Sequence, residues 1–367
     1  VCVVWAGLAP VGGYAQILEE RIAGQVAGIS DRSVSAVGDV RLTTPDFVTA
    51  LYTLREFRPI WTTPELRDDL AIAIREAERH GFRTEDFSVG ALQDLRAAAE
   101  TGGSDAVGLF DIAATEVAAR LLHHVYYGKV DPATLYANWT FERAFTPGNP
   151  ASLVNEYLEV ASVSALLKDI GITHPAYLRL KDGLARYRDI AARGGWPSVP
   201  QGTVLKPGME DEAVPVLRQR LAITGDFRGA VDEGLTYDDG LVAAVEAFQT
   251  RHGLEADAVV GPRTFAALNK PAGERVAQLR ASLERARWLF RDIGADYVFV
   301  NIGGPETFLV RDNKTVWKAR SIVGRAYRQT PVFRDDIQYM EFNPTWTVPV
   351  SIFRRDKLPL IRRDLGY

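Results

Sequence analysis

The chain is 367 residues long, which at roughly 100–200 residues per domain predicts two or three domains. Lysine and arginine number 43 and aspartate and glutamate 47, so the net charge is −4, and no basic excess exists to neutralise the phosphates of a nucleic acid. Hydrophobic residues make up 47% and charged residues 25%, which excludes wholesale disorder. No run of 18 apolar residues predicts a permanent membrane span.

The first fifteen residues are uncharged and end in V-G-G-Y-A, where Gly13 and Ala15 have the small-residue spacing of a signal-peptidase site. We interpret residues 1–15 as the remnant of a secretory signal peptide; a buried N-terminal strand is the alternative. The single cysteine, Cys2, lies in this segment. Cleavage after Ala15 would leave a mature chain without a thiol or a disulfide, so its stability would come from its cores.

Apolar residues recur at helical spacing through the first half of the chain. The stretch 64–81 places its apolar residues on one helical face and ends in Gly81, a typical helix stop. The stretch 110–127 repeats this pattern, and Asp131 followed by a proline predicts the start of a further helix. We therefore expect a helical scaffold domain over 40–200.

A compact unit of three short helices is predicted over 204–270. It follows the Gly/Pro-rich segment 194–202, which has the composition of a linker. Pro262 stands where a proline favours the start of the third helix. A unit of this size is near the lower limit for an independent core. The residues that we expect to form its core are Val214, Leu217, Leu221, Leu241, Val245 and Phe248.

The apolar period changes from helical to alternating in the last quarter of the chain. One more amphipathic helix is expected over 275–290. Among the strands that follow it, Asp312-Asn313 predicts a hairpin turn between the second and the third. A four-stranded sheet with one apolar face needs a second layer to cover it, so we interpret 275–367 as the incomplete first part of a β domain. The expected strands are 297–302, 307–311, 316–323 and 337–342.

Metal and nucleophile motifs are missing from the sequence. The five histidines are scattered, and the adjacent pair His123 and His124 would point about 100° apart on a helix. No H-x-x-x-H or H-E-x-x-H pattern is present, and no G-x-S-x-G elbow. We therefore expect neither a metal site nor a cofactor.

The stretch N-P-T-W-T-V-P (343–349) follows the last predicted strand. Pro344 and Pro349 favour an extended backbone outside the sheet. A rigid extended segment could present Trp346 to a cleft, and the alternative is a strand-exit loop whose tryptophan packs on the core.

Three stretches of the last region resemble the opening half of a YkuD-type L,D-transpeptidase domain. They are Y-V-F-V-N-I (297–302), S-I-V-G-R-A-Y-R-Q-T-P-V-F (321–333) and N-P-T-W-T-V-P-V-S-I (343–352). The pairing of T-P-V-F with N-P-T-W-x-V-P is specific. The resemblance implies a substrate-binding role for Asn343 and Trp346.

The two earlier regions are similar to domains that accompany this catalytic domain. F-Q-T-R-H-G-L (248–254) and G-P-R-T (261–264) resemble the type 1 peptidoglycan-binding module, although Asp257-Ala258 stands where that module usually has Asp-Gly, which puts a tight turn in doubt. The helical region resembles the scaffold domain of the large Gram-negative members in F-R-P-I-W (57–61), H-G-F (80–82) and Y-G-K-V-D-P (127–132). The expected fold is thus a mainly α scaffold and a three-helix module, followed by the incomplete first half of an all-β catalytic domain.

The resemblance implies cysteine acyl transfer in the periplasm. The family's cysteine lies in S-H-G-C-x-R with a histidine upstream, and neither motif occurs up to Tyr367, so we expect no catalytic residue here and an inactive fragment. The implied partners are peptidoglycan stem peptides and glycan, with membrane contact only through an uncleaved signal peptide. The alternatives are a non-catalytic peptidoglycan-binding or scaffold protein, and a wall amidase or carboxypeptidase, against which the missing zinc ligands count.

Overall fold

The computed structural model describes residues 11–137, 139, 148–160, 162–325, 327, 329–364 and 366. Cys2 and most of the predicted signal remnant lie outside these residues, while residues 11–15 form the first turns of a helix. No helix in this described part of the chain is both long and apolar enough to cross a membrane. The chain divides into a first unit, Val1–Ala137 with Glu142–Thr330, and a second unit, Asn138–Phe141 with Pro331–Tyr367.

The scaffold region of the first unit is a helical bundle around α5 (Ser104–Tyr127). This helix is buried along most of its length, and one hydrophobic cluster runs from Leu18 to Ile170. Helix α1 packs into that core ahead of residue 40, where we expected the domain to begin. The other elements are α1 (Val11–Ser30), β1 (Ala36–Val37), β2 (Val40–Arg41), α2 (Pro45–Leu54), α3 (Pro64–Ala77), η1 (Glu78–His80), η2 (Thr84–Phe87), α4 (Val89–Thr101), α6 (Pro132–Leu135), α7 (Pro150–Val160) and α8 (Val163–Asp169).

Local sequence explains how these helices begin and end. The Thr63 side chain accepts a hydrogen bond from the backbone N–H of Leu66, and Pro64 occupies the first turn of α3. Gly81 ends the η1 turn with a φ of +90°, a conformation that favours glycine. The Asp131 side chain likewise accepts from Ala133 at the start of α6. The predicted stop at Gly81 and start at Asp131 are therefore confirmed.

The three-helix module consists of α10 (Val214–Thr224), α11 (Asp239–Arg251) and α12 (Pro262–Leu268). All six predicted core residues are fully buried and belong to one cluster, which also takes in Val199 and Leu205 from the preceding segment. The Asp238 side chain caps α11 by accepting from the backbone N–H of Leu241 at 2.8 Å. The module thus has a core of its own.

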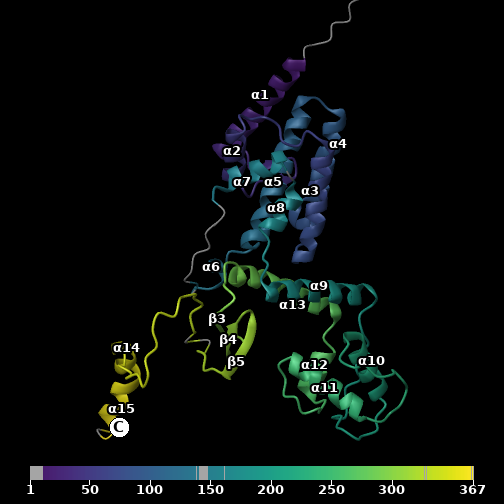
Figure 1. Cartoon of the computed structure of the whole chain (residues 1–367), viewed down its shortest axis with the longest axis vertical. Helices are drawn as coiled ribbons and strands as arrows, with labels where there is room; N and C mark the ends of the chain where they lie inside the picture. Colours follow the sequence, from purple (N-terminus) through teal and green to yellow (C-terminus); the bar gives the residue numbers. More distant parts are fainter. Residues whose placement is uncertain are drawn as a thin grey trace, which may run out of the picture. The chain divides into compact units, whose positions relative to one another are not determined.

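Two long helices flank the module in the sequence and lie side by side in space (Figure 1). These are α9 (Pro175–Ala192), which precedes the module, and α13 (Ala272–Phe290), which follows it. They share a separate hydrophobic cluster that includes Tyr177 and Leu184 from α9 and Leu283 from α13.

An antiparallel sheet of three strands in the order β3-β4-β5 follows α13. Its strands are β3 (Tyr297–Asn301), β4 (Glu306–Arg311) and β5 (Lys314–Arg320). Asp312 and Asn313 both have positive φ, as a tight hairpin turn requires, so that predicted turn is confirmed. The fourth predicted strand was wrong: residues 337–342 are irregular, because no neighbouring strand among the described residues pairs with their backbone.

The described residues of the second unit contain short helical segments, α14 (Val350–Ile352), η3 (Phe353–Lys357) and α15 (Leu358–Arg363). An isolated parallel bridge joins Trp139 to Val332. Before α14 the chain has no regular structure in its described residues from 333 to 349.

Candidate functional site

The two predicted substrate-binding residues lie in the irregular stretch of the second unit. Trp346 is 66% exposed, and Asn343 is exposed with a φ of +52°. Asparagine tolerates this left-handed conformation better than most residues, so the chain turns sharply just before Pro344. Because residues 337–342 form no strand, the expected exit from a sheet at residue 343 is not seen, and Trp346 is exposed to solvent rather than packed on a core. Whether it faces substrate stays a prediction.

The sheet of the first unit leaves several of its apolar side chains exposed. Val310 is buried, but Val298, Val300 and Trp317 are each between 44% and 54% exposed. Aromatic rings of α13 and of the sheet lie close together, and the ring centroids of Phe290 and Phe299 are 6.3 Å apart. Exposed apolar area of this kind marks an interaction surface or a face that another layer covers.

A glutamine of the F-Q-T-R-H-G-L motif organises the loop between α11 and α12. The Gln249 amide donates to Asp257 at 2.9 Å and to the carbonyl of Val259 at 3.0 Å, and its oxygen accepts from the backbone N–H groups of Asp257 and Ala258. The carbonyl of Ala258 accepts from the Tyr237 hydroxyl at 2.7 Å. This buried network holds the turn although Ala258 has a φ of +57°.

A second loop of the module, between α10 and α11, is held by Arg218. Its buried guanidinium donates to the carbonyls of Gly234 and Thr236 and pairs with Asp232 at 2.9 Å and Asp238 at 3.3 Å. Both loops of the module are therefore fixed by one long polar side chain from a helix.

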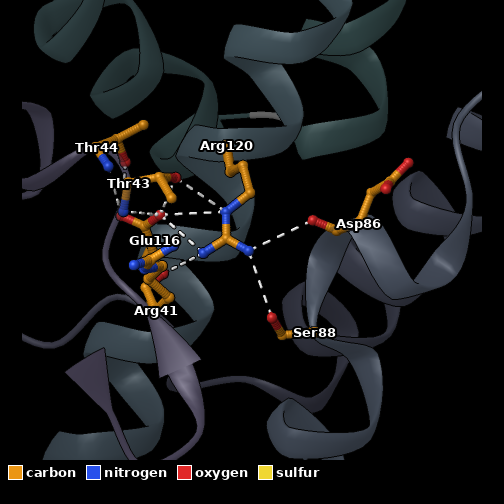
Figure 2. A network of polar contacts seen from close by, with 7 residues as sticks. All are labelled: Arg41, Thr43, Thr44, Asp86, Ser88, Glu116 and Arg120. Carbon is orange, nitrogen blue, oxygen red and sulfur yellow. Dashed lines mark hydrogen bonds and ion pairs between the residues drawn. The ribbon is translucent and has the colours of Figure 1, made fainter. Parts of the chain in front are cut away.

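The scaffold holds a buried ion pair between Glu116 and Arg120 of α5 (Figure 2). Glu116 is fully buried and accepts hydrogen bonds from the backbone N–H and hydroxyl groups of Thr43 and Thr44, at 2.7 to 3.0 Å. Arg120 lies 3.1 Å from Glu116 and donates to the carbonyl of Arg41. Because every partner is satisfied within the protein, this network joins α5 to the start of α2 and is structural rather than catalytic.

The F-R-P-I-W motif is anchored by a buried carboxylate of the same helix. Asp111 accepts from the Tyr52 hydroxyl at 2.5 Å and from the backbone N–H groups of Ile60 and Trp61. The Trp61 indole donates to Thr115 at 3.0 Å. Burial raises the pKa of Asp111, and hydrogen bonds from Tyr52 and the two backbone groups oppose that rise. The motif thus serves the fold of the scaffold.

Two histidines of the scaffold, His80 and His124, have pKa values that burial lowers. His80 lies 2.8 Å from the Tyr177 hydroxyl and 3.0 Å from the Lys181 ammonium, and burial, with the nearby Lys181 cation, lowers its pKa to about 3. Burial likewise lowers the pKa of His124 to about 3. Within the described ranges, no three histidine, cysteine, aspartate or glutamate side chains gather closely enough to hold a metal ion.

An open pocket of about 400 Å³ lies where the linker segment meets the start of α13. Small residues line most of it, and Trp196 contributes the one aromatic side chain. The Arg220 guanidinium stacks 3.8 Å from the centre of the Trp196 ring.

Three arginines and a carboxylate that face one side of α13 were not predicted from the sequence. Arg280, Glu284, Arg287 and Arg291 are spaced by three or four residues, so they share one helical face. This spacing is the one feature of the sequence that indicates a shared polar face on the helix. The arginines donate to backbone carbonyls and Glu284 accepts from a backbone N–H group, all far away in the sequence, so no local pattern reveals these partners.

Comparison with known families finds three matching domains along the chain. A family described as "Scaffold domain" matches residues 46–184, one described as "Putative peptidoglycan binding domain" matches 210–268, and one described as "L,D-transpeptidase catalytic domain" (YkuD) matches 295–367.

A curated relative supports the last of these matches. A protein of Haemophilus influenzae named "Putative L,D-transpeptidase" is 33% identical over 70 residues, which cover 19% of this chain and 14% of that protein. The match therefore spans about one seventh of the relative's length. The chain is thus similar, in this order, to a scaffold domain, a peptidoglycan-binding domain and an L,D-transpeptidase catalytic domain.

Proposed function

We propose that the protein is a peptidoglycan L,D-transpeptidase that cross-links diaminopimelate residues of neighbouring stem peptides. The observation that carries this proposal is the catalytic-family match over 295–367, which follows a peptidoglycan-binding domain with a closed core. Both domains address the same polymer, so the module would hold the enzyme on its substrate and raise the local concentration of stem peptides.

The proposed chemistry is acyl transfer through a cysteine thioester. A thiolate attacks the carbonyl between meso-diaminopimelate and D-Ala, the C–N bond breaks, and D-Ala leaves with a proton on its amine. The amine of a second stem peptide then attacks the thioester, forms the new amide and releases the thiol. A thiol suits both steps because a neighbouring histidine or helix N-terminus lowers its pKa towards neutrality.

The residues of this chain would take supporting roles in that reaction. Its one cysteine is Cys2, so we place the nucleophile and its histidine in sequence that follows Tyr367 in the natural protein, and we expect residues 1–367 alone to be inactive. Trp346 and Asn343 would line the cleft for the donor stem peptide. The substrate implies a periplasmic location, reached through the signal peptide that we interpret over residues 1–15.

The test is to read the natural gene beyond residue 367 and assay its full product. We expect an S-H-G-C-x-R motif, release of D-Ala from a tetrapeptide, and a covalent carbapenem adduct in the intact mass. The matched controls are the Cys→Ala variant of that motif and residues 1–367, both of which should give neither signal. A stop codon at residue 368, with binding to purified sacculi, would instead establish the non-catalytic peptidoglycan-binding alternative.

A further inference from the structure

Helix α13 lies outside the three stretches of the chain that match known families. The peptidoglycan-binding match ends at residue 268 and the catalytic match begins at 295, whereas α13 spans Ala272–Phe290. Its partner α9 also extends eight residues past the end of the scaffold match at 184. The question is which domain this helix completes.

The contacts along α9 and α13 are those of two helices running in opposite directions. Gly183 of α9 faces Leu279, while Tyr177, earlier in α9, faces Arg287, later in α13. Beyond the helices, the side-chain amide of Asn269 exchanges two hydrogen bonds with the backbone of Val199, at 2.8 and 2.9 Å. The chain therefore enters and leaves the module at one place, as inserted domains do.

Arginines of both helices bind the carbonyl end of the scaffold's α3–η1 segment. Arg280 donates to the carbonyl of Gly81 at 2.6 Å, and Arg287 donates to the carbonyl of His80. Arg188 of α9 donates to the carbonyl of Glu78 at 2.5 Å. The last carbonyls of a helix lack hydrogen-bond donors within the helix and carry partial negative charge. Arginine side chains there supply the missing donors and offset the charge.

A second contact joins α13 to the loop after α5. The Glu284 carboxylate accepts from the backbone N–H of Val130 at 2.9 Å, and a Cβ atom on Gly128 would lie 2.4 Å from the same carboxylate oxygen. Arg291, just after the helix, donates to the carbonyls of Tyr126 and Ile170 at 3.0 and 2.8 Å. Glycine is favoured here because its φ is +94° and because a Cβ atom would crowd the side chains of Glu284 and Trp288.

We propose that α13 is the last helix of the scaffold domain and that the peptidoglycan-binding module is inserted between α9 and α13. On this assignment, H-G-F and Y-G-K-V-D-P are the scaffold's docking surface for its own final helix. Their positions bear the carbonyls, the backbone N–H and the glycine that the arginines and Glu284 contact. The proposal concerns the fold and is independent of the proposed reaction.

The first strand of the catalytic sequence is held by contacts with the end of α13 and with His174. β3 begins seven residues after α13 ends, and Phe290 stacks on His174 at 4.5 Å between ring centroids. The Tyr297 hydroxyl lies 3.3 Å from the same histidine. The start of the catalytic sequence is thus positioned by the scaffold's last helix, not by the module.

Hydrogen exchange on the full chain carrying Phe248→Ala tests the proposal. This change removes a fully buried ring from the module's core. We expect peptides of α10, α11 and α12 to lose protection, while peptides of α13 and of residues 78–82 exchange within twofold of the unchanged protein. Loss of protection in α13 together with the module would assign the helix to the module and overturn the proposal.

A reciprocal variant keeps the test decisive if Phe248→Ala does not fold. Arg287→Met removes the donor to His80, and we expect at least tenfold faster exchange in α13 and residues 78–82 with the module unchanged. The matched control is Arg285→Met, an exposed arginine of the same helix, which should change neither. Unchanged exchange at 78–82 in the Arg287→Met protein would also overturn the proposal.

Discussion

The peptidoglycan-binding module and the catalytic stretch over 295–367 are of similar length but differ in how they cover their apolar residues. In the module, three helices send side chains into one closed cluster. In the catalytic stretch, Val310 is the one buried hydrophobic residue among those that the structure describes, while Ile322, Tyr339, Phe342 and Trp346 are each more than 60% exposed.

The difference follows from the geometry of the two element types. Three short helices joined by tight loops can surround a core with residues that are close in sequence. A three-stranded sheet is apolar on a face that it cannot cover by itself, so it needs a second layer. The module can therefore be tested as a closed unit, and the catalytic stretch as an open surface.

The largest expected effect is on the module's core. Phe248→Ala should lower the free energy of unfolding of the module by about 3–5 kcal/mol, since a fully buried ring leaves a cavity. Thermal unfolding followed by circular dichroism of the full chain measures the shift. Leu235→Ala, at a side chain that is 44% exposed, is the control and should change little. Equal melting of the two variants would mean that the module's core is not closed.

Removing a buried ion pair of the helical scaffold should cost more stability than removing an exposed ion pair of the sheet. Glu116→Gln leaves Arg120 buried without its counter-charge and should lower scaffold stability by about 3 kcal/mol. Asp296→Asn, which breaks an ion pair to Arg311 whose side chains are 51% and 60% exposed, should have an effect below about 1 kcal/mol. Chemical denaturation of both variants gives the comparison, and a larger loss from Asp296→Asn would contradict it.

The module should lose stability on mild acidification. Burial lowers the pKa of His252 to about 4, and its ordinary value is 6.5. Between these values the unfolded chain binds a proton that the folded module does not, so stability is complete above pH 6.5 and falls towards pH 4. Urea unfolding at several pH values measures the slope. His252→Gln should flatten it, and an unchanged slope would exclude His252 as its source.

A smaller effect of opposite sign is expected at the turn after α11. Ala258→Gly should stabilise the module by about 0.5–1 kcal/mol, because alanine at a φ of +57° is strained and glycine is not. Ala267→Gly, in helix α12, should destabilise it by about 1 kcal/mol and is the matched control. If both changes destabilise equally, the turn does not strain Ala258.

The smallest stability effect is expected on the open surface. Trp346 is 66% exposed, so Trp346→Phe should shift the melting temperature by no more than a degree or two. If Trp346 lines the substrate cleft, the same change in the full-length enzyme should slow acylation by a carbapenem substantially. Tyr339→Phe, at another exposed aromatic residue, is the control. Unchanged acylation in a folded Trp346→Phe protein would remove Trp346 from the proposed site.

The sequence by itself determined the helical regions, the module's core and the hairpin turn at Asp312-Asn313. These features depend on side chains three or four residues apart, or on the φ that a turn demands, so local patterns report them directly. The family resemblance, stated from the T-P-V-F and N-P-T-W-x-V-P stretches, agrees with the match over 295–367.

Only the tertiary structure decided which segments far apart in the sequence form hydrogen bonds with one another's backbone groups. The alternating pattern over 337–342 predicted a strand, but a strand also needs a neighbour to receive its hydrogen bonds. The carbonyls of residues 78–82 bind arginines that come about a hundred and two hundred positions later in the chain. Such pairs leave no local pattern, because each partner alone reads as a surface arginine or an ordinary helix end.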